Sequence, residues 1–285
     1  MTEKFLSLLA FSLFVGLGLT ACSQNSASLE SQKLTLTGSS TVAPLASEIA
    51  KKFEAEHPEV RIDVQTGGSS RGLADAVQGL ADIGMVSRSL EENETERYQS
   101  YAIALDGIGI ILESSNPVSS LSNKQVVDIY TGKIDNWQEV GGNNAPITVV
   151  NKAEGRSTLE LFLEYFELEN SQIQADVIIG DNQQGIKTVA GNKNAIGYVS
   201  IGAAEIDIDA GVPLKLLSVG GIDASTATVR DGSFPLSRPL NLVTTETPSG
   251  LTEKFIEFAQ SEKVHNLVEA QNFVPISSDQ LVKTL

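Results

Sequence analysis

Three short segments rich in serine, threonine and glycine each lie between a predicted strand and a predicted helix. They occupy residues 37–42, 66–72 and 151–158. The first N–H groups of a helix lack intrahelical partners and lie at the positive end of its dipole, so a helix start attracts anions. One such segment is typical of an ordinary N-cap. Three of them, two with an arginine, predict one small anion that is bound from several sides.

The candidate anion ligands are the hydroxyl and cationic residues of these segments and of residues 87–88. They are Ser39, Ser40, Thr41, Ser69, Ser70, Arg71, Ser87, Arg88, Lys152, Arg156, Ser157 and Thr158. A planar guanidinium suits an oxyanion, so we expect Arg88 and Arg156 to be the charged contacts. Arg71 could point outward from its helix start, and Lys152 could pair with Glu154 instead.

The elements that must position these residues alternate between strand and helix. Period-2 or continuous apolar patterns predict strands at residues 34–37, 60–64, 81–88, 102–112, 147–150, 177–179, 195–200 and 240–243. Apolar residues at helical spacing predict helices at residues 42–53, 73–80, 122–132, 159–166 and 185–190, and further helices in the tail. This alternation predicts an α/β architecture.

Composition narrows the function. The chain has 285 residues, enough for about two domains, and a net charge of −16. Such a charge argues against nucleic acid or an anionic membrane surface as a partner. No cluster of His, Cys and Asp has metal-ligand spacing, and no Walker or dinucleotide motif is present, so we expect no metal and no cofactor.

The first 22 residues form a predicted lipoprotein signal peptide. Residues 5–19 are apolar but too few to span a membrane, which is typical of a signal sequence. Residues 19–22 resemble the lipobox of bacterial lipoproteins, in which the cysteine is lipidated, and Cys22 is the single cysteine of the chain. We expect acyl chains such as palmitate on Cys22 to anchor the exported protein to a membrane. A polar, flexible tether is expected at residues 23–33.

Several motifs occur in an order that resembles the phosphate-binding component of bacterial phosphate ABC importers. They are Thr37–Pro44, Gly68–Gly72, Asp82–Arg88, Gly132–Gly142, Lys152–Thr158, Phe234–Leu240 and Phe273–Pro275. The resemblance implies the type II periplasmic-binding-protein fold, in which two α/β lobes joined by a two-segment hinge close on the ligand. Lobe I is then expected at residues 34–113 and 238–285, and lobe II at residues 114–237.

The same resemblance implies a function. The protein would bind inorganic phosphate with high affinity in the cell envelope, in the periplasm or at the outer face of the cytoplasmic membrane. It would deliver the ion to the permease subunits of an ABC importer. A monomer without enzymatic activity is expected.

Carried over by position, the resemblance assigns phosphate contacts to Ser40 and Thr41, to Ser69, and to Thr158 with the backbone of Arg156 and Ser157. Arg156 and Ser157 replace a usual Ser-Gly pair, and Ser87 stands where some relatives have an aspartate that accepts a hydrogen bond from protonated phosphate. Serine can also donate, so we expect the dianion to be favoured. Affinity should then rise between about pH 5.5 and 8, because among basic side chains only histidine is expected to titrate there.

Two other functions remain open. Residues 68–72 also match the G-x-S-x-G elbow of serine hydrolases, with Ser70 as nucleophile and His57 or His265 as the base. Both histidines fit structural positions better, and this alternative leaves the other two Ser/Gly segments unexplained. The second alternative is a binding lipoprotein for another oxyanion, or one with a sensing or adhesive role and no permease.

The lipobox generates the first prediction. Cys22→Ser should abolish acyl labelling of the protein and release or stall its precursor, because the thiol that carries the acyl chains is absent. Metabolic labelling with a fatty acid, followed by membrane fractionation, measures this. Full membrane retention of an unacylated wild-type protein would contradict it.

Overall fold

The computed structural model describes residues 32–276, which begin with strand β1 (Gln32–Gly38) and helix α1 (Val42–Glu56). Cys22, the predicted signal peptide and most of the predicted tether lie outside the described residues. Gln32 and Lys33, predicted as tether, belong to β1. Among residues 32–276, no helix combines the length and apolar character needed to cross a membrane.

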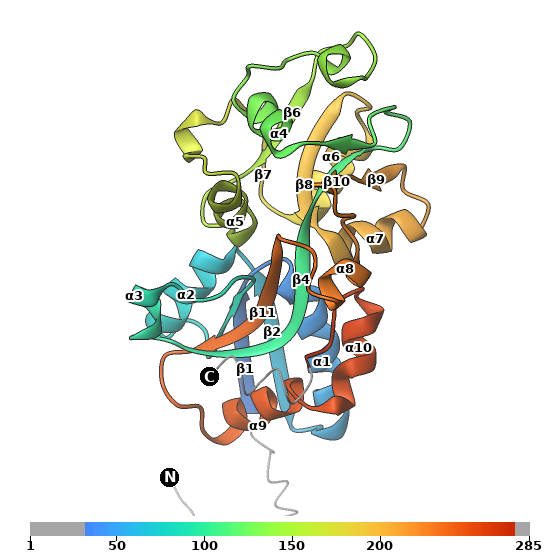
Figure 1. The fold of residues 1–285 in the computed structure, drawn as a ribbon. Coiled ribbons are helices and arrows are strands. Elements are labelled where there is room, and N and C mark those ends of the chain that lie inside the picture. Colours follow the sequence, from blue (N-terminus) through green and yellow to red (C-terminus); the bar gives the residue numbers. More distant parts are fainter. Residues whose placement is uncertain (1–31, 277–285) are drawn as a thin grey trace, which may run out of the picture. The chain divides into compact units, whose positions relative to one another are not determined.

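A nine-stranded mixed sheet runs through the described part of the chain (Figure 1). Its order is β2–β1–β3–β11–β4–β8–β6–β7, and β9 pairs with the end of β4. Strands β1, β2 and β3 are parallel to one another, as are β6, β7 and β8. The remaining bounds are β2 (Val60–Thr66), β3 (Ile83–Val86), β4 (Gln99–Glu113), β6 (Thr148–Lys152), β7 (Val177–Ile179), β8 (Ala195–Ser200), β9 (Leu214–Leu216) and β11 (Ser237–Thr244). A separate pair joins β5 (Ser120–Leu121) and β10 (Ser218–Val219).

Helices alternate with these strands, which confirms the predicted α/β architecture. They are α2 (Ser69–Val77), α3 (Glu92–Thr95), α4 (Asn123–Tyr130), α5 (Ser157–Tyr165), α6 (Asn182–Ala190), α7 (Ile201–Asp209), α8 (Thr226–Arg230), α9 (Gly250–Ala259) and α10 (His265–Ala270). Short 3₁₀ turns occupy Trp137–Val140, Asn170–Gln172 and Glu262–Val264.

The helix α7 is absent from the sequence-based prediction, as are α8 and the short strands β5, β9 and β10. Helix α7 follows β8 with no glycine or proline between them, and its apolar residues do not repeat at helical spacing. Its start is marked by Ser200, whose Oγ accepts a hydrogen bond from Ala203 N. This local cap gives little sequence signal because Ser200 also ends a strand pattern.

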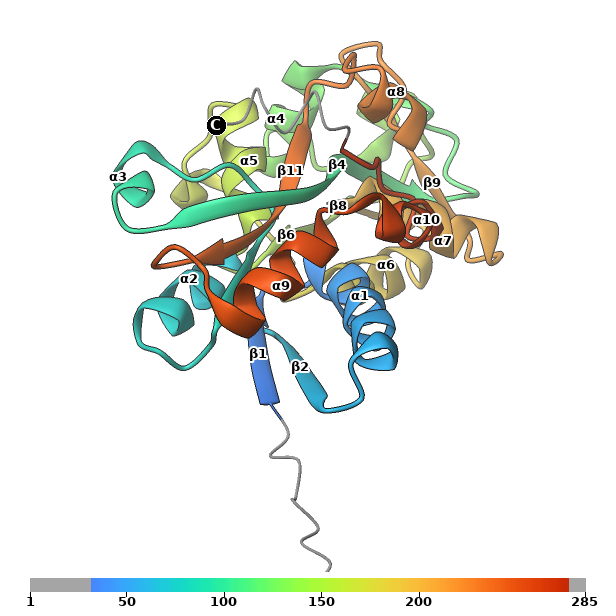
Figure 2. The same ribbon diagram turned by 90° about the horizontal axis from the view of Figure 1, so that it is seen from below.

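Two hydrophobic cores define two lobes. In lobe I, α1 and α9 cover one face of β1, β3 and β11, while α2 packs on the other face (Figure 2). In lobe II, α4 and α5 pack around Trp137, Phe162 and Tyr198. The rings of Phe162 and Tyr198 stack with centroids 4.0 Å apart, which fixes α5 against β8.

The long strand β4 belongs to both lobes. Residues up to Gly107 pair with β11, and from Ile108 onward they pair with β8 and β9. The second crossing lies directly beside the first, because Ile108 N donates to Leu236 O and Ser237 pairs with Gly107. The partner change in β4 therefore precedes residue 113, the expected end of the first segment of lobe I.

Close backbone packing places the start of α2 beside the ends of β1 and β3. A Cβ on Gly72 would lie 2.6 Å from Thr37 O and 2.9 Å from Gly38 Cα. Gly38 itself has φ +135°, a conformation that side chains disfavour. Glycine at these positions lets the first turn of α2 reach the carboxyl ends of the strands.

We predict that Gly72→Ala destabilises the protein by about 1–3 kcal/mol, because the new methyl group meets backbone atoms that cannot rotate away. It should also displace Ser69 at the start of α2. Urea unfolding measures the loss, and Val77→Ala is the control, since the Val77 side chain on the same helix is exposed. Equal stability of the two variants would contradict the packing argument.

Candidate anion-binding site

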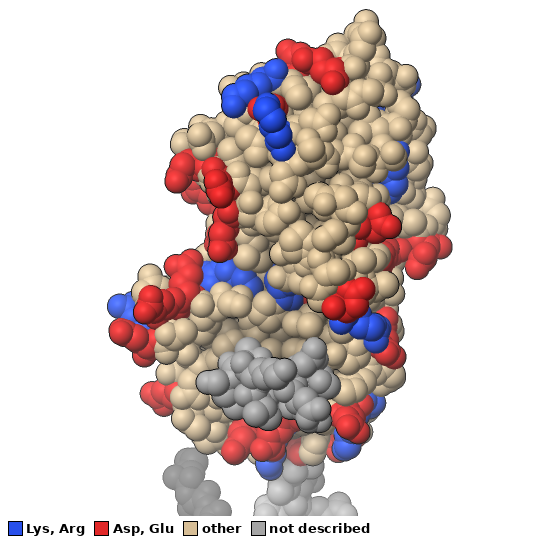
Figure 3. Space-filling model, viewed as in Figure 1, with Lys and Arg blue, Asp and Glu red and all other residues tan. Residues whose placement is uncertain are grey.

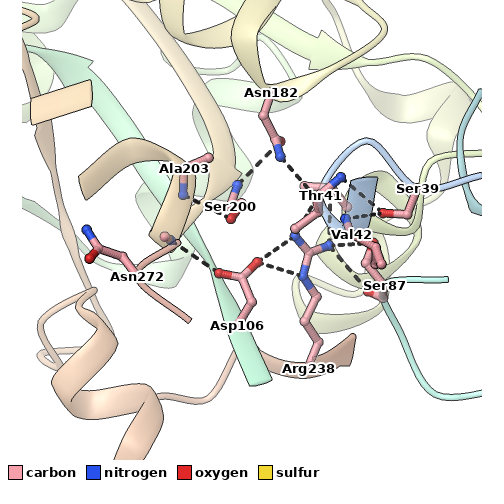
Figure 4. A network of polar contacts seen from close by, with 12 residues as sticks. Ser39, Thr41, Val42, Ser87, Asp106, Asn182, Ser200, Ala203, Arg238 and Asn272 are labelled. Carbon is pink, nitrogen blue, oxygen red and sulfur yellow. Dashed lines mark hydrogen bonds and ion pairs between the residues drawn. The ribbon is translucent and has the colours of Figure 1, made fainter. Parts of the chain in front are cut away.

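A buried ion pair between β11 and β4 lies at the centre of the polar network (Figure 4). Arg238 Nη2 and Nε lie 2.9 and 3.2 Å from Asp106 Oδ2, and each side chain is 1% exposed. The other carboxylate oxygen, Oδ1, accepts from Gly202 N at 3.2 Å. Each charge thus has a partner, which a buried pair requires because desolvation of a charge is costly.

The guanidinium of Arg238 also donates to hydroxyl groups from three separate elements. Nη1 donates to Thr158 Oγ1 at 3.0 Å and to the Oγ and O of Ser87 at 3.3 Å, and Nη2 donates to Thr41 Oγ1 at 3.2 Å. A hydroxyl oxygen that accepts from arginine keeps its own hydrogen for donation elsewhere. Arg238 therefore makes Thr41, Ser87 and Thr158 donors toward any further ligand.

At the start of α1, helix capping and ligand recognition are divided between two residues. Ser39 Oγ accepts from Thr41 N at 3.1 Å and Val42 N at 3.4 Å, so Ser39 caps the helix. Thr41 Oγ1 is thereby free of capping, and it accepts a second hydrogen bond from Asn182 Nδ2 at 3.0 Å. Both of its acceptor positions are occupied.

The starts of α2 and α5 bring further donors to the same region. Ser69, 1% exposed, accepts through its Oγ from Ser87 N at 3.3 Å. Ser157 Oγ and Arg156 Nε are buried and have no hydrogen-bond partner among residues 32–276. Buried polar atoms are nearly always paired, so these two atoms are suited to an acceptor such as an oxyanion.

Two of the predicted cationic ligands are neutralised by carboxylates. Arg88, expected as a charged contact, is paired at 2.7 Å with Glu94 and at 2.6 Å with Glu160. Burial lowers the pKa of Arg88, but these two carboxylates outweigh it and raise the pKa above its ordinary value. Arg71 pairs with Asp75 and is largely exposed, in line with an outward orientation. Figure 3 shows basic side chains in the hollow below α5 with acidic side chains on its rims.

Lys152 does not pair with Glu154. The Oε1 of Glu154 accepts from Asn170 Nδ2 at 2.9 Å, whereas the buried Lys152 Nζ donates to Asn182 Oδ1 at 3.1 Å. Burial, followed by the nearby charge of Arg238, lowers the pKa of Lys152 to about 7. The expectation that only histidine titrates between pH 5.5 and 8 is therefore wrong.

The last two predicted ligands lie at the margin of the site. Ser40 is half-buried and lines a groove of about 460 Å³ with Thr66 and Phe273, and Thr41 and Asn182 of the network line the same groove. Ser70 is exposed, and its Oγ donates to Glu160 Oε1 at 3.2 Å. Neither hydroxyl joins the network on Arg238.

Three residues of the network are missing from the predicted ligands: Arg238, Asp106 and Asn182. A signal exists for Asp106, because it is a carboxylate inside the apolar run of residues 102–112, and a charge in a buried strand needs a partner. Arg238 belongs to one of the motifs that carry the resemblance, but nothing in the pattern shows which way it faces. Among residues 32–276, no group of three or more His, Cys, Asp or Glu side chains could hold a metal ion.

Comparison with known proteins adds independent findings. A family model described as a PBP superfamily domain matches residues 23–263. The phosphate-binding protein PstS of Bacillus subtilis is 29% identical over 258 residues, which is 89% of this chain and 84% of that protein.

Two solved structures are similar along their whole length. One, with bound phosphate, is described as a phosphate ABC transporter substrate-binding protein from Clostridium perfringens; it is 32% identical, with a TM-score of 0.80, and the match covers 86% of this chain and 100% of that one. The other, an ABC-type phosphate transport receptor from Vibrio cholerae, is 28% identical, with a TM-score of 0.70 and the same coverage. These likenesses confirm the predicted type II periplasmic-binding fold with two lobes.

We predict that Asp106→Asn destabilises the protein by about 3–5 kcal/mol, because it leaves the buried Arg238 charge without a counter-ion. Thermal or urea unfolding measures the change. The matched control is Glu56→Gln, which removes an exposed pair with Lys263 and should change stability by less than about 0.5 kcal/mol. Equal effects in the two variants would show that the Arg238–Asp106 pair has no special role.

Proposed function

The chain belongs to the PBP superfamily, and on this premise we propose that it binds one inorganic phosphate ion between its lobes. It delivers this ion to the permease of an ABC importer. The observation that carries the proposal is the set of hydroxyl groups that both lobes direct to Arg238, with Thr41 and Ser87 from lobe I and Thr158 from lobe II. The relatives named above, whose printed names are those of phosphate-binding and phosphate-transport proteins, support it.

The chemistry of the site fits a tetrahedral oxyanion. Phosphate is rich in acceptor oxygens, and the site presents hydroxyl hydrogens, the unpaired Arg156 Nε and Ser157 Oγ, and the N–H groups at helix starts. We assign the direct contacts to Thr41, Ser69, Ser157 and Thr158, with Arg156 as the charged contact. Ser39, Ser40, Ser70, Arg71 and Arg88 have structural or marginal places.

The charge balance of the site favours a dianion. Lys152 and Arg156 have no carboxylate within ion-pair distance among residues 32–276, whereas Arg238 and Arg71 each have one and Arg88 has three. The acceptors near the site are already occupied: Asp106 Oδ1 by Gly202 N, and Thr41 Oγ1 by Arg238 and Asn182. The phosphate dianion carries one O–H group and the monoanion carries two, so a site whose acceptors are largely committed to the protein's own donors favours the dianion.

Delivery requires the lobes to open and close. We place the hinge where the two crossings lie side by side, at Gly107–Ile108 of β4 and at Leu236–Ser237 before β11. Lobe I then comprises residues 34–107 and 237–276 of the described chain, and lobe II comprises residues 108–236. Small rotations at two adjacent segments can move one lobe as a body without breaking either core.

The same proposal covers location and assembly. PstS-like binding proteins act in the cell envelope, and we propose that this chain is exported there as a monomer and held at a membrane by acyl chains on Cys22.

The rival serine-hydrolase function finds no support at Ser70, since its Oγ donates to Glu160. His57 packs against the ring of Phe53 at the end of α1, with centroids 4.3 Å apart and the ring planes tilted by 34°. We therefore propose a binding protein without catalytic activity.

We predict that Thr158→Val weakens phosphate binding at least tenfold, because a charge-assisted hydrogen bond contributes about 1.5–3 kcal/mol and valine keeps the shape of threonine. Calorimetric titration with phosphate, sulfate, molybdate and arsenate measures affinity and selects among oxyanions. Thr188→Val is the matched control, since its hydroxyl bonds only within α6. A wild type that prefers another oxyanion, or equal affinity in the two variants, would overturn the proposal.

A further inference from the structure

Lys152 is a buried basic residue of the site, and no carboxylate of residues 32–276 lies within ion-pair distance of it. It ends β6, is 3% exposed, and its Nζ makes a single hydrogen bond, to the neutral Oδ1 of Asn182 at 3.1 Å. Asn182 in turn donates to Thr41 Oγ1. Lys152 is thus three hydrogen bonds away from Arg238, on the lobe II side of the proposed phosphate contacts.

The charged and titratable groups that face Lys152 come from four elements. Arg238 of β11 and Arg156 at the start of α5 are cations, and Asp181 at the start of α6 is the single carboxylate. Asp181 Oδ1 accepts from Gln184 N at 2.8 Å and lies beyond ion-pair distance of Lys152. Tyr198 of β8 is buried and neutral, because burial raises its pKa, and its hydroxyl accepts from Lys152 N at 3.4 Å.

An ammonium group in this place would be buried beside two guanidinium groups with no anion in contact. Burial and like charge both disfavour the protonated form of a lysine. The same two causes lower the pKa of Lys152 to about 7. By contrast, the buried Arg238 retains its charge because Asp106 compensates it at 2.9 Å.

We propose that Lys152 is a proton-linked determinant of anion recognition, a neutral amine in the ligand-free protein and an ammonium when a phosphate dianion occupies the site. The inference rests on the proposed function, since it needs an anion at the hydroxyl groups on Arg238. The dianion supplies the counter-charge that Lys152 lacks, which raises the proton affinity of Nζ. Binding therefore places a proton on the amine.

The source of this proton depends on the ionic form of the ligand. A phosphate monoanion brings its own: its O–H bond breaks, an N–H bond forms at Lys152 Nζ, and the bound pair is dianion plus ammonium. A free dianion brings none, so the proton is taken from solvent. Fully deprotonated sulfate also brings no proton. The proton on Lys152 Nζ in the sulfate complex is therefore either present on the amine before binding or taken from solvent.

This linkage predicts the pH dependence of binding. Below neutral pH, Lys152 is protonated but phosphate is mainly the monoanion, so a proton leaves on binding. Above neutral pH, phosphate is the dianion but Lys152 is neutral, so a proton is taken up. Phosphate affinity should thus be highest near neutral pH and fall on both sides, whereas sulfate affinity should only fall as pH rises.

The test is calorimetric titration of the purified protein with phosphate in buffers of different ionisation enthalpy. We expect uptake of about one proton per phosphate at about pH 8, and release of about one at about pH 6. Lys152→Arg, which carries a permanent charge, should release protons at the lower pH and take up none at the higher pH. Lys152→Met, which cannot be protonated, should likewise take up none and serves if the arginine variant fails to fold.

Binding of phosphate by the wild type without proton uptake at the higher pH would overturn the inference and leave the proposed function intact. Uptake that persists unchanged in both variants would also overturn it, since another group would then carry the proton. Failure of the wild type to bind phosphate at either pH would overturn the proposed function and, with it, this inference.

Discussion

The site depends on one buried ion pair, Arg238 with Asp106. Asp106 holds the guanidinium in place from one side, and Gly202 N holds the carboxylate. The remaining N–H groups of Arg238 then reach hydroxyls of both lobes, and each hydroxyl that accepts from it keeps its own hydrogen to donate onward. Hydroxyl groups, which can both donate and accept hydrogen bonds, are thereby oriented as donors. A ligand whose surface consists of acceptor oxygens requires such donors. Without the pair, the same hydroxyls could turn to bond one another.

The parts of the structure that the sequence predicts depend on local pattern, and the parts that it does not predict depend on contacts between distant residues. Strands and long helices follow from apolar periodicity, and these elements place the three helix starts where the sequence suggested. Helix α7 begins directly at the end of β8 and lacks apolar periodicity, and the short strands β5, β9 and β10 depend on pairing with distant segments, so local pattern does not predict them. In the site, residue type identified the hydroxyls, but only the fold decides that Ser39 caps α1 while Thr41 faces Arg238.

Cations were the least predictable residues because their charge state depends on partners distant in sequence. Arg88 finds Glu160, 72 residues away, and is neutralised. Arg238 donates a hydrogen bond to Thr41, 197 residues away in sequence, and lies at the centre of the hydroxyl network. Lys152 has no carboxylate within ion-pair distance in the described part of the chain, and burial lowers its pKa to about 7. The sequence favoured Arg88, left Lys152 open and did not single out Arg238, whereas desolvation and pairing give each of the three a different role.

The cross-lobe contacts divide into two groups with different consequences for affinity. Thr41, Thr158 and Arg238 join the lobes through groups that also face the anion, so the ligand strengthens these contacts. Glu160 joins the lobes outside them, through Arg88 and Ser70, and Ser70 N adds a bond to Gly155 O. These outer contacts do not involve the anion, so they lower the free-energy difference between open and closed forms that an anion must supply. The contacts of Glu160 with Arg88 and Ser70 therefore contribute to affinity together with the groups that face the anion. A substitution of Glu160 alters affinity without altering selectivity among anions.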